Sequence, residues 1–153
     1  MIIAAVDLGK ARTGIAVCDK TEFLASPHTV IFEKSPEKLF EKVKETVVNL
    51  KAEIVVVGLP KNMDGSEGES AQNARVFAER LHTETGLQVD LQDERGTTIT
   101  AHNFLNDTNT RGKKRKNVVD EVAATIICKI ILIKERTVRI INLYNLYLTH
   151  LLT

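Results

Sequence analysis

The chain has 153 residues, of which 43% are hydrophobic and 27% are charged, and its formal net charge is +1. This length suits one domain of about 100–150 residues, and this composition suits one core with an ordinary water-facing surface. The sequence opens without the basic leader of a signal peptide. It has no uncharged apolar run of about 18 residues, the minimum for a membrane helix. We therefore expect a cytoplasmic protein without membrane contact.

The beginning of the chain predicts a hairpin. Residues 2–6 are apolar and rich in β-branched side chains, which indicates a buried strand ending at Asp7. Gly9 and Gly14 are expected to bracket a turn, after which residues 15–18 return as a second strand. Strands joined this tightly pair in antiparallel fashion.

Strands and helices then alternate. Residues 28–32 are a candidate third strand, and Ser35-Pro36 marks a helix start, because serine caps helices and proline has no amide hydrogen to lose in the first turn. Apolar residues at helical spacing continue to Leu50. Residues 53–57 form a continuous apolar run, which is typical of a parallel strand buried on both faces.

The second half repeats this alternation. Apolar positions within residues 71–81 predict a helix that Gly86 terminates, and a strand then ends at residues 93–95. A last helix is expected over residues 118–127. Strands connected through helices pair in parallel, so the whole chain predicts an α/β fold, a mixed central sheet with helices on both faces.

Three acidic residues that are far apart in the sequence are candidates for one site. Asp7 ends the first strand, Glu94 ends the last strand, and Asp120 lies in the first turn of the final helix. Ligands of open α/β sheets bind outside the carboxyl ends of the strands. Carboxylate oxygens suit Mg²⁺ or Mn²⁺, and two such ions about 4 Å apart can activate water and stabilise the leaving oxygen in phosphodiester hydrolysis.

Each acid also has a structural interpretation. Asp7 could simply end a strand, Glu94 could pair with Arg95, and Asp120 could be a favourable acid near a helix start. Residues 111–116 hold five of the 21 basic residues just before Asp120. Such a cluster can bind phosphate, although an exposed basic loop is the alternative.

Four segments resemble motifs of the YqgF/RuvX family in the family's order. They are DLGKARTGIA at residues 7–16, VGLPKNMDGS at residues 57–66, DER followed by two threonines at residues 93–98, and KKRKNVVD at residues 113–120. The resemblance covers residues 1–128, and an apolar extension over residues 129–153 does not match the family.

The resemblance implies a ribonuclease H-like nuclease domain over residues 1–128. It implies that Asp7, Glu94 and Asp120 bind the catalytic metal, with Asp93 as the rival to Glu94. It also suggests a group of substrate-binding residues, namely Arg12, Asn62, Arg95, Lys113, Lys114, Arg115 and Lys116. For Arg95, the alternative is that it anchors the acidic cluster electrostatically. Asp64 is more simply explained as a turn-forming residue.

The implied function is nucleolytic maturation of the 5′ end of pre-16S ribosomal RNA, with structured precursor RNA as the partner. Resolution of Holliday junctions in branched DNA is the alternative. Two further classes of protein compete with a nuclease. One is a nucleic-acid-binding module without catalysis. The other is an actin-type or sugar-kinase-type ATPase, which would need a second lobe that 153 residues do not supply. Both a monomer and a homodimer are compatible with the sequence, since a junction resolvase needs two symmetric sites.

Overall fold

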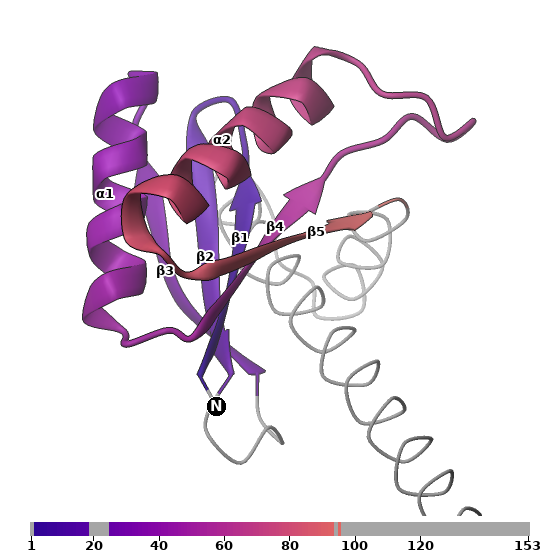
Figure 1. Ribbon diagram of the computed structural model, residues 1–153. Coiled ribbons are helices and arrows are strands. Elements are labelled where there is room, and N and C mark those ends of the chain that lie inside the picture. The colour runs from indigo at the N-terminus through magenta and orange to yellow at the C-terminus, as the bar shows by residue number, and fades with distance from the viewer. Residues whose placement is uncertain (1, 19–24, 94, 96–153) are drawn as a thin grey trace, which may run out of the picture.

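The computed structural model describes residues 2–18, 25–93 and 95. These residues form a mixed sheet with two helices packed on it (Figure 1). The elements in chain order are β1 (Ile3–Leu8), β2 (Arg12–Cys18), β3 (Ala25–Phe32), α1 (Pro36–Asn49), β4 (Ile54–Leu59), α2 (Glu69–Thr85) and β5 (Gln88–Asp93). The strand order across the sheet is β3-β2-β1-β4-β5. The predicted mixed α/β sheet is therefore confirmed.

β1 lies at the centre of the sheet and carries both kinds of pairing. It is antiparallel to β2 and parallel to β4, and β4 is parallel to β5. β2 already begins at Arg12, and Gly14 lies inside it opposite Asp7. The expectation that Gly14 closes the turn was therefore wrong. Thr13 pairs with Leu8 on one side and with Ile31 on the other, so ladder hydrogen bonds extend β2 to within three residues of Gly9.

The two helices among the described residues, α1 and α2, cover the same face of the sheet (Figure 1), so the prediction of helices on both faces is confirmed here for one face only. The side chains of Phe40 and Phe77 meet edge to face between α1 and α2, with their ring centroids 5.3 Å apart. The buried cluster between helices and sheet contains Ala4, Val6, Ile15, Phe40, Val43, Val47, Ala52, Val55, Val57, Leu59, Ala71, Ala74, Ala78 and Leu81. Ile3 and Ala5 on the opposite face are fully buried as well. The helix expected over residues 118–127 lies outside the described residues.

The helix ends follow the sequence signals closely. Pro36 occupies the first turn of α1 and Ser35 the capping position, but the Ser35 hydroxyl makes no capping hydrogen bond. The backbone amides of Lys34 and Ser35 instead donate to the Glu33 carboxylate, at 3.0 and 3.1 Å. α2 ends at Gly86, whose φ of 71° is the left-handed conformation that glycine adopts without strain.

Thr13 in β2 carries a buried hydroxyl group. Its side chain is fully buried, and among the described residues its Oγ1 is the one buried side-chain polar atom without a hydrogen-bond partner. A polar group buried in this way costs roughly 1–3 kcal/mol. We expect Thr13→Val, which keeps the shape and removes the hydroxyl, to raise the free energy of unfolding by about 1 kcal/mol.

Urea unfolding of the two proteins measures this difference, provided that the slope with denaturant stays unchanged. Ile15→Val in the same strand is the matched control, because it only removes a methylene group and should lower stability by about 1 kcal/mol. A Thr13→Val protein less stable than the wild type would contradict the assignment of an unpaired hydroxyl.

Candidate active site at the carboxyl ends of the parallel strands

The carboxyl ends of β1, β4 and β5 meet at one edge of the sheet, because the three strands are parallel. Val6 is paired with Val57, and Gly58 with Gln92. Asp7, which follows Val6, therefore stands level with Gly58 and Gln92. The structure thus positions the first predicted acid at the end of the central strand.

Strand alternation decides on which face each acid lies. Val6 and Leu8 pack against the helix-side core, so Asp7 between them points to the opposite face, where it is half-buried. Leu91 packs against the helix-side core, and Asp93 shares its face because the two residues are two positions apart in β5. Asp7 and Asp93 therefore lie on opposite faces of the sheet.

Asp93 is also bound to Arg95. The backbone amide of Arg95 donates to Asp93 Oδ1 at 3.0 Å, and its guanidinium contacts Asp93 Oδ2 through Nε at 2.9 Å and Nη2 at 2.7 Å. The side-chain hydrogen bond from Arg95, followed by its backbone hydrogen bond, holds the pKa of Asp93 below its ordinary value. Asp93, the last residue of β5, is thus an ionised partner of Arg95.

The turn after Asp7 is tight. A Cβ atom on Gly9 would overlap the backbone carbonyl oxygen of Arg12, so only glycine fits at this position without a shift of the backbone. Arg12 opens β2 two residues before Gly14, the residue opposite Asp7. Strand alternation therefore puts Arg12 on the same face of the sheet as Asp7.

The loop between β4 and α2 is a hairpin over residues 61–67 that its own hydrogen bonds hold closed. The Asn62 backbone amide donates to the Ser66 carbonyl oxygen at 2.9 Å, and Asn62 Nδ2 donates to Ser66 Oγ at 2.8 Å. Asp64 Oδ1 accepts from the Ser66 hydroxyl and amide, which lower the pKa of Asp64 in that order. Asn62 and Asp64 therefore build this loop.

The hairpin presents a residue that the sequence reasoning missed. Met63 is 75% exposed and lines a hollow together with Gln92, Asp93 and Arg95. The only sequence signal was an apolar residue placed among turn-forming ones. The other expected site residues, Glu94, Asp120 and residues 113–116, lie outside the described residues. Within the described part of the chain, no three His, Cys, Asp or Glu side chains come together as a metal site.

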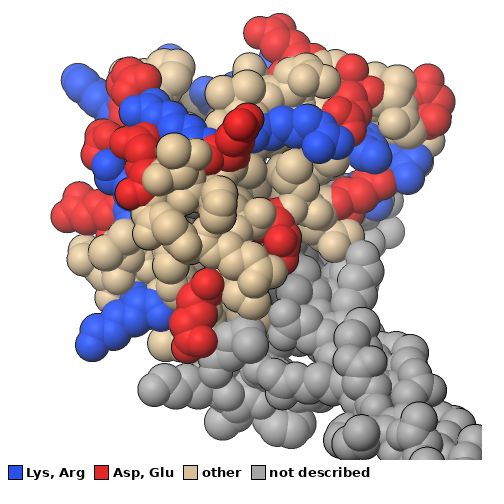
Figure 2. Space-filling view, viewed as in Figure 1, with Lys and Arg blue, Asp and Glu red and all other residues tan. Residues whose placement is uncertain are grey.

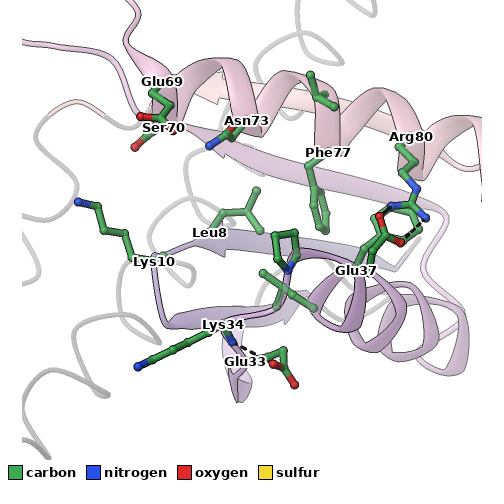
Figure 3. Close-up of a pocket in the computed structure, with 15 residues that line it drawn as sticks. Leu8, Lys10, Glu33, Lys34, Glu37, Glu69, Ser70, Asn73, Phe77 and Arg80 are labelled. Carbon is green, nitrogen blue, oxygen red and sulfur yellow. Dashed lines mark hydrogen bonds and ion pairs between the residues drawn. The ribbon is translucent and has the colours of Figure 1, made fainter.

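A second hollow lies on the helix side of the sheet, between α1, α2 and the β1–β2 turn (Figure 3). Leu8, Phe40 and Phe77 contribute its apolar lining, and Arg80 crosses it from α2, 3.9 Å above the Phe40 ring, to bind Glu37. Acidic and basic side chains are intermingled over the helix-bearing face (Figure 2). This hollow does not include Asp7, and no single sign of charge marks it for phosphate.

Solved structures of Thermus thermophilus RuvC are similar in fold to this chain. Thermus thermophilus RuvC matches with a TM-score of 0.55 over 90% of this chain and 97% of that one, at 15% sequence identity. The same protein in complex with a Holliday junction substrate matches with a TM-score of 0.58 over 90% of this chain and 96% of that one, at 14% identity. The chain therefore has the ribonuclease H-like fold that its resemblance to the YqgF/RuvX family implies.

The sequence comparisons define the family more narrowly. The family model described as "RuvX: Holliday junction resolvase" matches residues 1–133. A Halothermothrix orenii protein named "Putative pre-16S rRNA nuclease" is 39% identical, over 83% of this chain and 91% of its own length. A protein of the same name from Listeria innocua is 38% identical, over 83% of this chain and 94% of its own length. The chain belongs to the RuvX family, as its four motifs predict.

A helix must be both long and apolar to cross a lipid bilayer. Among the residues that the structure describes, neither helix combines the length and apolar character needed to cross it.

Proposed function

We propose that this protein is a metal-dependent nuclease that hydrolyses phosphodiester bonds in nucleic acid. The observation that carries the proposal is the position of Asp7, at the carboxyl end of the central strand and on the face away from both helices. Membership of the RuvX family supports it. Asp7, Glu94 and Asp120 are the proposed catalytic acids and the ligands of Mg²⁺ or Mn²⁺, most simply two ions.

The choice of Glu94 over Asp93 rests on the described geometry of β5. Asp93 shares a face with Leu91, which is the opposite face from Asp7, and its carboxylate is bound to Arg95. Ligands of one ion must converge on it. The neighbouring acid in the chain, Glu94, is therefore the better partner for Asp7.

The remaining residues have proposed roles in holding the substrate. Arg12, on the face of Asp7, and the basic residues 113–116 would contact phosphates and so position the strand without reading its bases. Arg95 forms a salt bridge with Asp93. This favours a structural role for Arg95 at the end of β5 over direct phosphate binding. The ions, when bound, would activate the attacking water and stabilise the leaving oxygen.

The preferred substrate is precursor 16S ribosomal RNA, because the relatives that match over almost their whole length are named as nucleases of pre-16S rRNA. Branched DNA is the second candidate, because the family description and the similar solved structures concern Holliday junctions. We further propose that the protein acts in the cytoplasm, that residues 1–128 are the nuclease domain, and that it works as a monomer or as a homodimer.

Cleavage of two end-labelled substrates tests this function. A 16S precursor RNA and a four-way DNA junction are each incubated with wild-type protein and Mg²⁺ or Mn²⁺, with a chelator as the control. We expect metal-dependent cleavage of the RNA. Cleavage of the junction alone would move the assignment to a resolvase, and tight, salt-sensitive binding without any cleavage would identify a non-catalytic binding module.

A further inference from the structure

Met63 is the most exposed of the large hydrophobic side chains that the structure describes. Its exposed fraction is 75%, compared with 65% for Val76 on α2 and 55% for Phe32 on β3. It stands on the hairpin of residues 61–67, which extends from the body of the sheet after β4 (Figure 1). A single exposed apolar side chain is ordinary on a protein surface, so Met63 is of interest because of the hollow that it lines.

The exposure does not come from a loose loop. The amide of Gly65 donates to the Asn62 carbonyl oxygen at 2.8 Å, and the Asn62 and Ser66 side chains are joined at 2.8 Å. Lys61 and Glu67 form a bridge at the base, where Glu67 also binds Arg75 of α2. The hairpin therefore holds Met63 outward from a fixed backbone.

The hairpin lies against the end of β5. A Cβ atom on Gly65 would stand 3.4 Å from Arg95 Nη1, so the hairpin backbone and the guanidinium are neighbours. The hollow between them is shallow and open, and its described lining consists of Met63, Gln92, Asp93 and Arg95. Gln92 of β5 is paired with Gly58 of β4, and β4 is the neighbour of β1 in the sheet. The hollow therefore lies at the same edge of the sheet as Asp7, where the parallel strands end.

The charges of the hollow decide what it can bind. The Asp93 carboxylate balances the charge of Arg95, with Arg95 Nη2 lying 2.7 Å from Asp93 Oδ2. The nearby Lys61 and Asp64 add one positive and one negative charge, so they leave the net charge unchanged. A phosphate would therefore gain little net attraction here. A flat, uncharged nucleobase suits the lining better, because it can stack on a thioether and on the plane of a guanidinium. Its polar edge can meet the Asp93 carboxylate and the side chain of Gln92, whose Nε2 also donates to the Asp93 carbonyl oxygen at 3.2 Å.

We propose that this hollow receives an unpaired nucleobase of the substrate, and that Met63 is the positioning residue on which the base stacks. The inference rests on the proposed nuclease function and adds a preference to it. A nucleotide that enters the hollow must be unstacked from its neighbours, so single-stranded segments are bound in preference to continuous duplex. Met63 acts through the placement of the strand and not on the reacting bond.

The test measures binding in the Asp7→Asn background, so that cleavage does not interfere. A single-stranded RNA of the 16S 5′ precursor sequence carries 2-aminopurine at one position at a time. We expect one position to change its fluorescence on binding. Met63→Ala should abolish that change and raise Kd about 5- to 150-fold, as for the loss of one stacked base. Met63→Leu should restore most of the binding.

Val76→Ala, which shortens an exposed apolar side chain on α2, is the matched control and should leave both signals unchanged. Equal Kd values and equal fluorescence for Met63→Ala and its parent would overturn the inference. That failure is distinct from failure of the nuclease proposal, which is tested by cleavage with the unmutated protein. In a cleaving enzyme, Met63→Ala should raise KM more than it lowers kcat.

Discussion

Asp7→Asn should fold like the wild type and lose metal-dependent cleavage by about a thousandfold. Asp7 stands at the end of the central strand, where an ion held by its carboxylate would contribute several kcal/mol to the stabilisation of transition-state charge. The amide keeps the shape of the side chain and removes its negative charge. Single-turnover cleavage of the preferred substrate with saturating Mg²⁺ measures the loss directly.

Asp64→Asn is the matched control for this variant. Asp64 is an acid too, but its carboxylate accepts hydrogen bonds from Ser66 within the hairpin. We expect this control to keep cleavage within a few-fold of the wild type while its thermal unfolding shows a small loss of stability. Full cleavage by a folded Asp7→Asn protein would remove Asp7 from the catalytic set.

Neutralising the basic segment should produce the second large effect. Replacement of Lys113, Lys114, Arg115 and Lys116 by glutamine removes four proposed phosphate contacts. For single-stranded nucleic acid the slope of log Kobs against log salt concentration should become shallower by about 3, and for duplex by about 4. Binding at low salt should weaken strongly, whereas kcat at saturating substrate should change little.

The control replaces four exposed lysines in α1 and in the segments that flank it by glutamine: Lys34, Lys38, Lys42 and Lys51. It changes the net charge by the same amount but leaves the proposed substrate path untouched. The salt dependence of binding, measured by fluorescence anisotropy, should separate the two variants clearly. Equal slopes for both would show that the protein responds to overall charge and not to residues 113–116.

The sequence allowed the fold to be predicted because its strongest signals were local and repeated. The run at residues 53–57 predicted a strand buried on both faces, and β4 is buried along its whole length. Gly86 predicted the end of α2, and in the structure its backbone adopts the left-handed conformation that ends the helix. The prediction that Gly14 closes a turn was wrong, because a glycine in a strand cannot be told from a glycine in a turn until the pairing of the neighbouring residues is known.

The candidate site could be predicted only in part. Asp7 was found because a strand-ending acid before a glycine turn is a recognisable pattern. The separation of Asp93 from Asp7 depends on the register of β5 against β4, which no local pattern encodes. The pairing of Asp93 with Arg95 is local, but the sequence does not show which of the two neighbouring acids Arg95 contacts. The outward position of Met63 depends on the hydrogen bonds that close the hairpin.

The binding of Mn²⁺ to four variants tests the central claim most directly. Asp7→Asn, Glu94→Gln, Asp93→Asn and Asp120→Asn are each titrated with Mn²⁺, and the free ion is followed by its electron paramagnetic resonance signal. We predict that Asp93→Asn binds like the wild type and that the other three lose high-affinity binding. Retained binding in Glu94→Gln together with lost binding in Asp93→Asn would contradict the proposed ligand set.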